Sequence, residues 1–341
     1  MSTTKALHTG LRHAGTNRRL SELLLKHAVW LILLFLLAIF CAFIPGYAQS
    51  GIFFNILEQS TFVGILSVAL AIVIIAGQMD LSIESTMALA AMLTAWLSSP
   101  AGLGWQPDPA WLVVPATLAV ALAIGAVIGL FNALVVLRFG ITAFIATLAT
   151  YIFLRGAVVA FNGGKGAFGL PPELRAIATT HLGGIPVLAL ITIVLFAIFT
   201  FILAKTPFGR YLYLLGGNPV APFRAGISIR KVAIWSFVLS GMLAAFAGWL
   251  LAARTAGATA NLGVGMLFEA FAAVVIGGVS LKGGIGGLSG VFAGVLLLSS
   301  IRTAINLLGM PPQYTQMIQG ALVLAAMLLD ALKQSIRARY L

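Results

Sequence analysis

Long apolar stretches recur about every thirty residues along this chain, and short polar segments separate them. A helix needs about 20 apolar residues to cross the hydrocarbon layer of a bilayer. The pattern therefore predicts an all-α fold, a polytopic transmembrane helical bundle of about ten spans. We expect the spans near residues 28–45, 57–77, 83–98, 111–137, 141–161, 184–204, 232–253, 266–279, 284–307 and 314–332.

The predicted membrane domain covers residues 28–332. A cytoplasmic N-terminal segment, 1–27, precedes it, and a cytoplasmic tail, 333–341, follows it. The windows 83–98 and 266–279 are short for complete crossings. Each is interpreted either as a full span or as a half-helix of the broken kind that transporters use near their pathway.

Basic residues give the orientation of the bundle. The net charge is +12, and fifteen of the 20 Lys and Arg residues fall in segments that the ten-span arrangement places on one side. Cytoplasmic loops of membrane proteins carry this excess of positive charge. Because an even number of spans puts both ends on the same side, we expect both termini in the cytoplasm. Because the basic residues cluster in these loops, the positive net charge reflects the orientation of the spans rather than nucleic-acid binding.

Composition excludes a soluble domain and offers little for catalysis. Hydrophobic residues make up 61% of the chain and charged residues 8%, against about 45–50% and about 25% in soluble domains. The phosphate-binding pattern GxxxxGK[ST] and the GxSxG pattern are absent from the sequence. Its histidines and its single Cys41 lack metal-ligand spacing. We expect no enzyme activity, no cofactor and no metal site, so any ATP hydrolysis belongs to a separate partner.

Acidic residues at the junction of the second and third predicted spans are the first candidate site. Asp80 and Glu84 lie one helical turn apart, with Ser82 between them. A carboxylate at membrane depth is costly, so it usually faces protein, water or a partner. Two interpretations stay open: Asp80 caps the next helix with help from Ser82, or the three residues line a translocation path or gate.

Three further charged residues fall near the predicted outer ends of their spans. Arg155, Glu269 and Arg302 are expected at a similar height in the membrane. If they face inward, they pair with one another or ring an outer vestibule. If they face lipid, the arginines extend to the interface.

Glycine repeats predict close helix packing. Gly286, Gly290 and Gly294 recur at every fourth position. This spacing leaves one helix face bare, so that another helix can approach closely.

The long inner loop, 205–231, is expected to contain a short amphipathic helix. Asn218 can cap this helix, Pro219 suits its first turn and Gly226 ends it. One interpretation is an interfacial helix held by anionic membrane lipid. The other is a docking element for a cytoplasmic partner. The residues assigned to this element are Gly216, Gly217, Asn218, Pro219, Ala221, Arg224, Ala225 and Gly226.

Three motifs carry a family resemblance: GGNPVAPFRAGI at 216–227, GQMDLSIES at 77–85 and FEAFAAVVIGGVSLKGGIGGLSGVFAG at 268–294. They resemble the coupling loop, the G-x-D-L-S-V-G-S junction and the glycine-rich run of one family. That family comprises the membrane permease subunits of ATP-binding-cassette importers for ribose, xylose, galactose and autoinducer-2. The resemblance extends from about residue 55 to residue 330.

This resemblance implies a permease subunit that passes a sugar or sugar-like solute across a bacterial-type inner membrane. It implies separate ATPase subunits docked at the coupling loop, an extracytoplasmic sugar-binding receptor, and a second permease copy in a homo- or heterodimer. The alternative is an ion- or proton-coupled secondary transporter with Asp80 and Glu84 as its ion site.

Two positions depart from the family pattern. Glu84 replaces a usual glycine and puts a second carboxylate beside Asp80. The sequence from Ala221 to Arg224 reads APFR where the family commonly has EAAR, so an acidic contact with the ATPase is absent.

Overall fold

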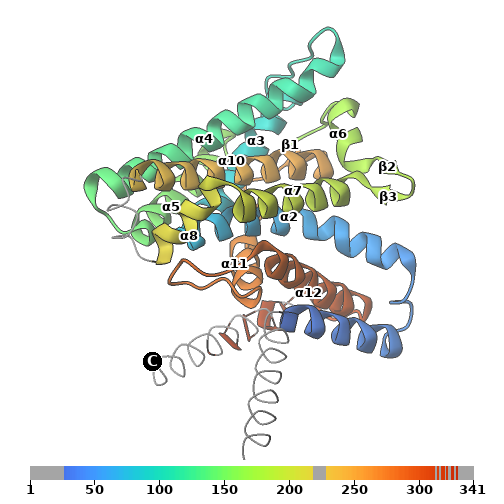
Figure 1. Cartoon of the computed structure of the whole chain (residues 1–341). Helices are drawn as coiled ribbons and strands as arrows, with labels where there is room; N and C mark the ends of the chain where they lie inside the picture. Colours follow the sequence, from blue (N-terminus) through green and yellow to red (C-terminus); the bar gives the residue numbers. More distant parts are fainter. Residues whose placement is uncertain are drawn as a thin grey trace, which may run out of the picture.

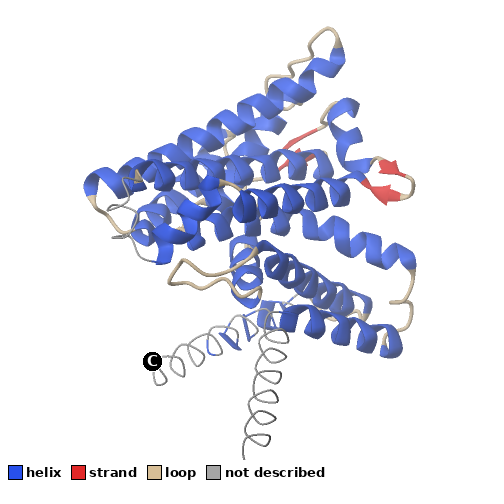
Figure 2. Cartoon of the chain, viewed as in Figure 1, coloured by secondary structure: helices blue, strands red, loops and turns tan. Residues whose placement is uncertain are grey.

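The computed structural model describes residues 27–217, residues 228–311 and scattered positions between 313 and 328. This part of the chain is mostly helical (Figure 2). A first helix covers His27–Phe43. The other helices are α2 (Ser50–Ile75), α3 (Ile83–Ser98), the 3₁₀ turn η1 (Ala110–Leu112), α4 (Val113–Phe139), α5 (Ala143–Phe161), α6 (Pro172–Thr179), α7 (Val187–Lys205), α8 (Pro207–Gly217), α10 (Ile229–Thr255), α11 (Met266–Ile276) and α12 (Leu288–Leu307).

Two small antiparallel strand pairs lie in the connections. In the first, β1 (Ala167–Phe168) pairs with β4 (Gly257–Ala258), which joins the segment after α5 to the segment after α10. In the second, β2 (His181–Leu182) pairs with β3 (Ile185–Pro186) in a hairpin before α7.

Helices α2 and α10 form the centre of the bundle. Their apolar windows are 89% and 72% buried, against 33% or less for α4, α5 and α7. Helix α10 packs on α4, α3 and α2, and α2 packs in turn on α7, α11 and α12. In Figure 1, α11, α12 and the first helix lie together on one side of α2, with α3, α4 and α10 on the other. The peripheral helices expose apolar side chains, as expected of surfaces that face lipid.

Glycines allow the closest helix contacts in this bundle. A Cβ atom on Gly125 of α4 would lie 2.3 Å from the carbonyl oxygen of Gly241 of α10. One on Gly290 of α12 would lie 2.1 Å from the Gly277 oxygen, and one on Gly294 would lie 2.4 Å from the Ala273 oxygen at α11. Since lipid gives no hydrophobic drive for helix association, such backbone approach supplies the packing energy.

The predicted glycine face differs from the structure at one residue. Gly286 precedes α12, which begins at Leu288, and its φ is +142°. It therefore belongs to the loop between α11 and α12 and shares no helix face with Gly290 and Gly294. The sequence prediction was wrong here because a four-residue spacing does not show where a helix starts.

Among the residues that the structure describes, six helices are long and apolar enough to cross a membrane. They are α2, α4 with its leading turn, α5, α7, α10 and α12, and three shorter apolar helices accompany them: His27–Phe43, α3 and α11. The predicted span 314–332 lies mostly outside the described residues. The structure thus gives a helical bundle with six candidate spans, and the number ten stays a prediction.

Helix α11 is shorter than its predicted window. Its 11 residues extend about 16 Å at 1.5 Å per residue, roughly half of a hydrocarbon layer about 30 Å thick. The chain leaves it through Gly278, whose φ of +85° ends the helix, and reaches α12 by an irregular loop. Irregular backbone at membrane depth is tolerated where protein or a water-filled cavity surrounds it.

We predict that Gly290→Ala weakens the α11–α12 contact, because the new methyl group meets the Gly277 carbonyl. Overpacking of this kind costs about 1–3 kcal/mol of unfolding free energy. Gly287→Ala is the matched control, since Gly287 has an extended φ of −163° and nothing within 4 Å of an added Cβ. Thermal unfolding of both purified variants measures the difference. Equal melting temperatures would contradict the close contact.

Candidate functional site

A buried polar network fills the break between α2 and α3. The Asp80 side chain is 1% exposed. Its Oδ1 accepts the Ser82 backbone N–H at 3.0 Å and the Ser82 hydroxyl at 2.6 Å, and its Oδ2 accepts the Ser240 hydroxyl of α10 at 2.9 Å. Three donors thus satisfy a carboxylate that has no basic partner within 4 Å among the described residues.

Two neighbouring helices extend this network. Asn132 of α4 donates to the Ser82 hydroxyl at 2.8 Å and accepts the Thr150 hydroxyl of α5 at 2.7 Å. The Thr147 hydroxyl accepts the Leu81 N–H at 3.0 Å. The break between α2 and α3 is therefore held by α4, α5 and α10 together, and the freed N–H groups of Leu81 and Ser82 and the carbonyl of Met79 have side-chain partners.

The position of Asp80 bears on whether it caps α3 or lines a translocation path. Ser82 is the N-cap residue of α3, and it makes no side-chain cap bond. Asp80 accepts the N–H of Ser82 itself, so it closes the turn that leads into the helix. Its contacts are all internal to the bundle.

Glu84 has its own partners, separate from those of Asp80. This carboxylate is 1% exposed. Its Oε1 accepts Nη2 of Arg155 at 2.5 Å and the Tyr151 hydroxyl at 3.2 Å, both from α5. Its Oε2 accepts the N–H groups of Gly265 and Leu267, each at 3.0 Å. Glu84 therefore places a negative charge at the N-terminus of α11, where the helix dipole favours one.

Arg155 completes this arrangement from the other side. Its Nη1 donates to the carbonyl oxygens of Ala260 at 3.1 Å and Leu262 at 3.4 Å. The ion pair between Glu84 and Arg155 thus supplies acceptors and donors to one irregular segment, 260–267, which leads into α11. We call these two side chains and that segment the Glu84 clamp.

The predicted group of Arg155, Glu269 and Arg302 divides into two. Arg302 of α12 forms an ion pair with Glu269 of α11, whereas Arg155 binds Glu84 instead. The expected pairing within the group is thus found for Glu269 and Arg302 but not for Arg155, because spacing and height do not say which face of a helix a side chain occupies. Asp80 and Glu84 have separate partners, and their role in a translocation path stays a prediction.

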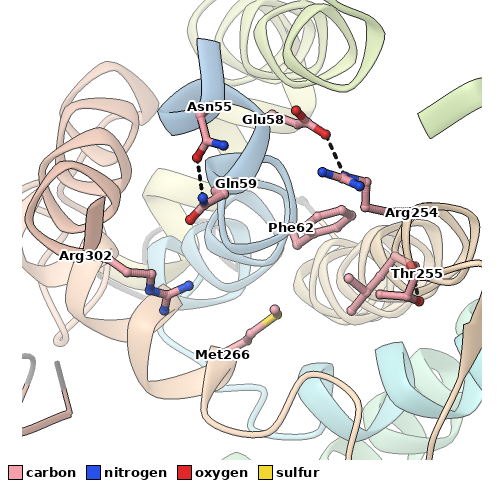
Figure 3. A pocket seen from close by; sticks show the side chains of 9 residues that line it. Asn55, Glu58, Gln59, Phe62, Arg254, Thr255, Met266 and Arg302 are labelled. Atoms are coloured by element: carbon pink, nitrogen blue, oxygen red, sulfur yellow. Dashed lines mark hydrogen bonds and ion pairs between the residues drawn. The ribbon is translucent and has the colours of Figure 1, made fainter. Parts of the chain in front are cut away.

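A pocket with polar walls lies beside the Glu269–Arg302 pair, between α2, α10, α11 and α12 (Figure 3). Its volume is about 310 Å³. Asn55, Glu58, Gln59 and Phe62 line it from α2, with Leu251, Arg254 and Thr255 from α10, Met266 from α11 and Arg302 from α12. We call it the Gln59 pocket.

Most of the residues of the Gln59 pocket escape sequence reasoning. Glu58 and Arg254 form an ion pair at 2.6 Å across the gap between α2 and α10, and Gln59 donates to Asn55 one turn earlier on α2. A polar run at the start of an apolar window was the only available signal. The partners Asn132 and Ser240 of the Asp80 network had a similar weak signal, since both are polar residues inside apolar windows.

Most of the predicted coupling residues lie outside the described part of the chain. Asn218, Pro219, Ala221, Arg224, Ala225 and Gly226 belong to this set. Gly216 and Gly217 are described, at the end of α8. A Cβ atom on Gly216 would lie 2.0 Å from the Ile75 oxygen and 2.5 Å from the Gly284 nitrogen, and Gly284 donates its N–H to Ile75 at 2.9 Å.

The ends of α2 and α8 therefore meet the α11–α12 loop backbone to backbone. Tyr213 of α8 adds a hydrogen bond, since its hydroxyl donates to the Gly286 oxygen at 2.9 Å. Burial raises the pKa of this hydroxyl, which keeps it a donor. We call the contact among Gly77, Gly216 and Gly284 the glycine junction.

No group of three or more His, Cys, Asp or Glu side chains in the described residues is placed to hold a metal ion. What the described residues provide is a set of buried polar networks at helix breaks, together with the Gln59 pocket, which has polar and apolar lining.

We predict that Asp80→Asn changes the unfolding free energy by less than about 1 kcal/mol, because the amide keeps an acceptor for Ser82 and the Ser240 hydroxyl can turn to accept. Asp80→Ala leaves buried donors without a partner, at about 1–3 kcal/mol. Thermal unfolding and solute uptake are measured for both variants. A stable Asp80→Asn protein that no longer transports would assign the charge to the path or gate instead.

We expect the Glu84 clamp to contribute more to the unfolding free energy than the Asp80 side chain does. Removing one partner of a buried ion pair costs about 3–5 kcal/mol, so Glu84→Ala and Arg155→Ala should each destabilise strongly, and the double variant should cost less than their sum. The Glu58–Arg254 pair is the control, since Arg254 is 46% exposed and exposed pairs contribute about 0–1 kcal/mol. Double-mutant cycles of denaturant unfolding measure both. Additive effects at Glu84 and Arg155 would refute the clamp.

Comparison with known proteins identifies the family. The family model for the permease component of branched-chain amino acid transport systems matches residues 52–327. The ribose import permease of Haemophilus influenzae is 33% identical over 324 residues, 94% of this chain and 97% of that protein. The galactose/methyl galactoside import permease of the same organism is 33% identical over 92% of this chain and 96% of its own.

A third relative, the autoinducer 2 import permease of an Enterobacter species, is 32% identical over 89% of this chain and 85% of that protein. No solved structure matches the chain significantly. With its apolar helical spans, this protein is a multi-pass inner-membrane protein. It belongs to the family of membrane permease subunits of ATP-binding-cassette importers that includes the ribose, galactose and autoinducer 2 import permeases.

Proposed function

We propose that this protein forms the translocation pathway of an ATP-driven importer for a sugar or sugar-like solute. The observation that carries the proposal is the coverage of the relatives: proteins named as ribose and galactose import permeases align with more than nine-tenths of the chain. The sequence has no phosphate-binding loop of its own. ATP is therefore hydrolysed in separate ATPase subunits.

The proposed topology has ten spans and two cytoplasmic termini. Positive charge at residues 1–27, 205–231 and 333–341 supports it. In this topology the N-terminus of α2 and the C-terminus of α10 lie outside, and the end of α8 lies inside. The Gln59 pocket then opens toward the extracytoplasmic side, and the glycine junction faces the cytoplasm.

The proposed partners follow from this topology. ATPase subunits dock at the coupling loop 205–231, a sugar-binding receptor delivers solute from outside, and a second permease copy completes the transporter. Exposed apolar side chains on α5, including Phe144, Ile152 and Phe153, leave a surface for lipid or for the second copy.

The proposed mechanism is alternating access powered by the ATPase. ATP binding and hydrolysis bias the permease between two arrangements. The glycine junction gives this bias a route, since the end of α8 carries Gly216 and Gly217 of the coupling residues and contacts the end of α2 and the α11–α12 loop. Movement of α8 is then transmitted to the Asp80 turn and to the α11–α12 loop.

We predict ATP-dependent uptake of labelled ribose or galactose by proteoliposomes that contain the permease, its ATPase and its receptor. Omitting the receptor, or replacing the phosphate-binding lysine of the ATPase, should reduce uptake to background. A protonophore and sodium removal are the controls, and both should leave uptake unchanged. Uptake that needs an ion gradient but no ATP would instead indicate the secondary transporter, which the relatives do not favour.

A further inference from the structure

We propose that the Gln59 pocket is a solute-binding site of the permease itself, and that it selects neutral polyhydroxylated molecules over ions and amino acids. The inference rests on the proposed function and goes further, because it assigns a location and a selectivity within this chain. Four features of the pocket carry it: its size, its charge balance, its free hydrogen-bonding groups and its apolar floor.

The size suits a small molecule. A cavity of about 310 Å³ falls at the lower end of the roughly 300–1,000 Å³ range of small-molecule sites. Its mouth carries exposed polar groups, among them Asn55 and Arg254. Its floor is closed by Phe62 and Leu251, which are 6% and 5% exposed. The pocket is thus open at one end and closed toward the centre of the bundle.

The charges of the pocket cancel. Arg254 is neutralised by Glu58, which also lines the pocket, and Arg302 is neutralised by Glu269 behind the wall. Each guanidinium therefore has its own carboxylate before any ligand arrives. An anion, a cation or an amino-acid zwitterion would have to break one of these pairs to gain a counter-charge. A neutral ligand has no such requirement.

Hydrogen-bonding groups remain available for hydroxyls. Gln59 donates to Asn55, so the Gln59 side-chain oxygen and the Asn55 amino group have no partner among the described residues. Arg254 contacts Glu58 through Nε, and its two terminal amino groups, which are further donors, have no hydrogen-bond partner among the described residues. Adjacent hydroxyl groups of a polyol can both donate to and accept from such groups.

The apolar floor complements the other face of such a ligand. Phe62 and Met266 present aromatic and thioether surface beside the polar wall (Figure 3). Leu251 adds aliphatic surface to the lining. A ring sugar has hydroxyl groups around its edge and C–H groups on its faces. Polar groups that orient the ligand, set in a largely apolar pocket, are the usual construction of a specific small-molecule site.

The position of the pocket connects binding to transport. Its wall includes Met266, the first residue of α11, and the N-terminus of α11 is held by Glu84 through Gly265 and Leu267. A ligand in the Gln59 pocket would therefore contact the short helix whose following loop reaches the glycine junction. Solute released by the receptor would meet this element before it enters the bundle.

Direct binding to the full-length permease in nanodiscs tests the proposal. The probes are labelled ribose and galactose as neutral sugars, with leucine and ribose 5-phosphate as charged comparators. We expect saturable binding of at least one neutral sugar and none of the charged probes. Gln59→Leu should weaken sugar binding by about fivefold to tenfold, the loss of one or two hydrogen bonds. Asn55→Leu, at the more exposed mouth, should act in the same direction.

Gln49→Leu is the matched control, because it makes the same change at the start of α2, outside the pocket lining, and should leave binding unchanged. Glu58→Gln tests the charge balance: it leaves Arg254 without its carboxylate, so ribose 5-phosphate should now bind. Melting temperatures show whether each variant is folded.

Three results would overturn the proposal: no binding of any neutral sugar, equal binding by Gln59→Leu and wild type, or displacement of sugar by leucine. A co-purified phospholipid that occupies the pocket and resists displacement by sugar would also overturn it. The proposed function has its own readout in ATP-dependent uptake by the wild-type complex. If the wild-type complex shows ATP-dependent uptake but Gln59→Leu leaves sugar binding unchanged, the solute site at the Gln59 pocket is rejected while the proposed importer function stands.

Discussion

Two helix breaks deep in this bundle leave backbone N–H and C=O groups without helical partners, and the Asp80 network and the Glu84 clamp both respond to that constraint. Hydrocarbon offers no hydrogen bonds, so each freed group needs a partner within the protein. At the α2–α3 break the partners come from the Asp80 network. At the start of α11 they come from Glu84 and Arg155. Both carboxylates are buried because the backbone that they satisfy is buried.

The Glu84 clamp illustrates why a buried ion pair is present at all. Such a pair is commonly neutral or unfavourable for stability when compared with apolar residues of the same size. Here the pair does more than neutralise itself, since its remaining donors and acceptors satisfy five groups on Tyr151 and on the 260–267 segment. An apolar replacement would leave those groups unpaired at membrane depth. The pair thereby fixes where α11 begins and how it is oriented.

Helix α11 links the two ends of the proposed transport path. Its first residue, Met266, lines the Gln59 pocket. Its last turn leads through Gly278 to the loop that contacts α2 and α8 at the glycine junction. Side chains of any size would separate the three backbones at that junction. A short helix held by hydrogen bonds at one end and by close backbone contact at the other can move as a unit, which is what transmission between a coupling loop and a solute site requires.

The sequence by itself determined the class of protein, most helix positions and the family motifs. Apolar windows are decisive because a bilayer demands about 20 apolar residues per span, and the positions of α4, α5, α7 and α10 follow from them. The sequence also singled out Asp80, Glu84, Arg155, Glu269 and Arg302, since charged residues are rare and costly in apolar windows.

Only the tertiary structure decided how those residues are paired. Sequence spacing placed Glu84 with Asp80 and grouped Arg155 with Glu269 and Arg302, whereas the fold joins Arg155 to Glu84 and leaves Glu269 paired with Arg302. The helix start at Leu288, the length of α11 and the assembly of the Gln59 pocket from four helices were equally beyond the sequence. The physical reason is that a charged side chain is satisfied by whatever lies within about 3 Å of it, and in a bundle those neighbours come from helices distant in the chain.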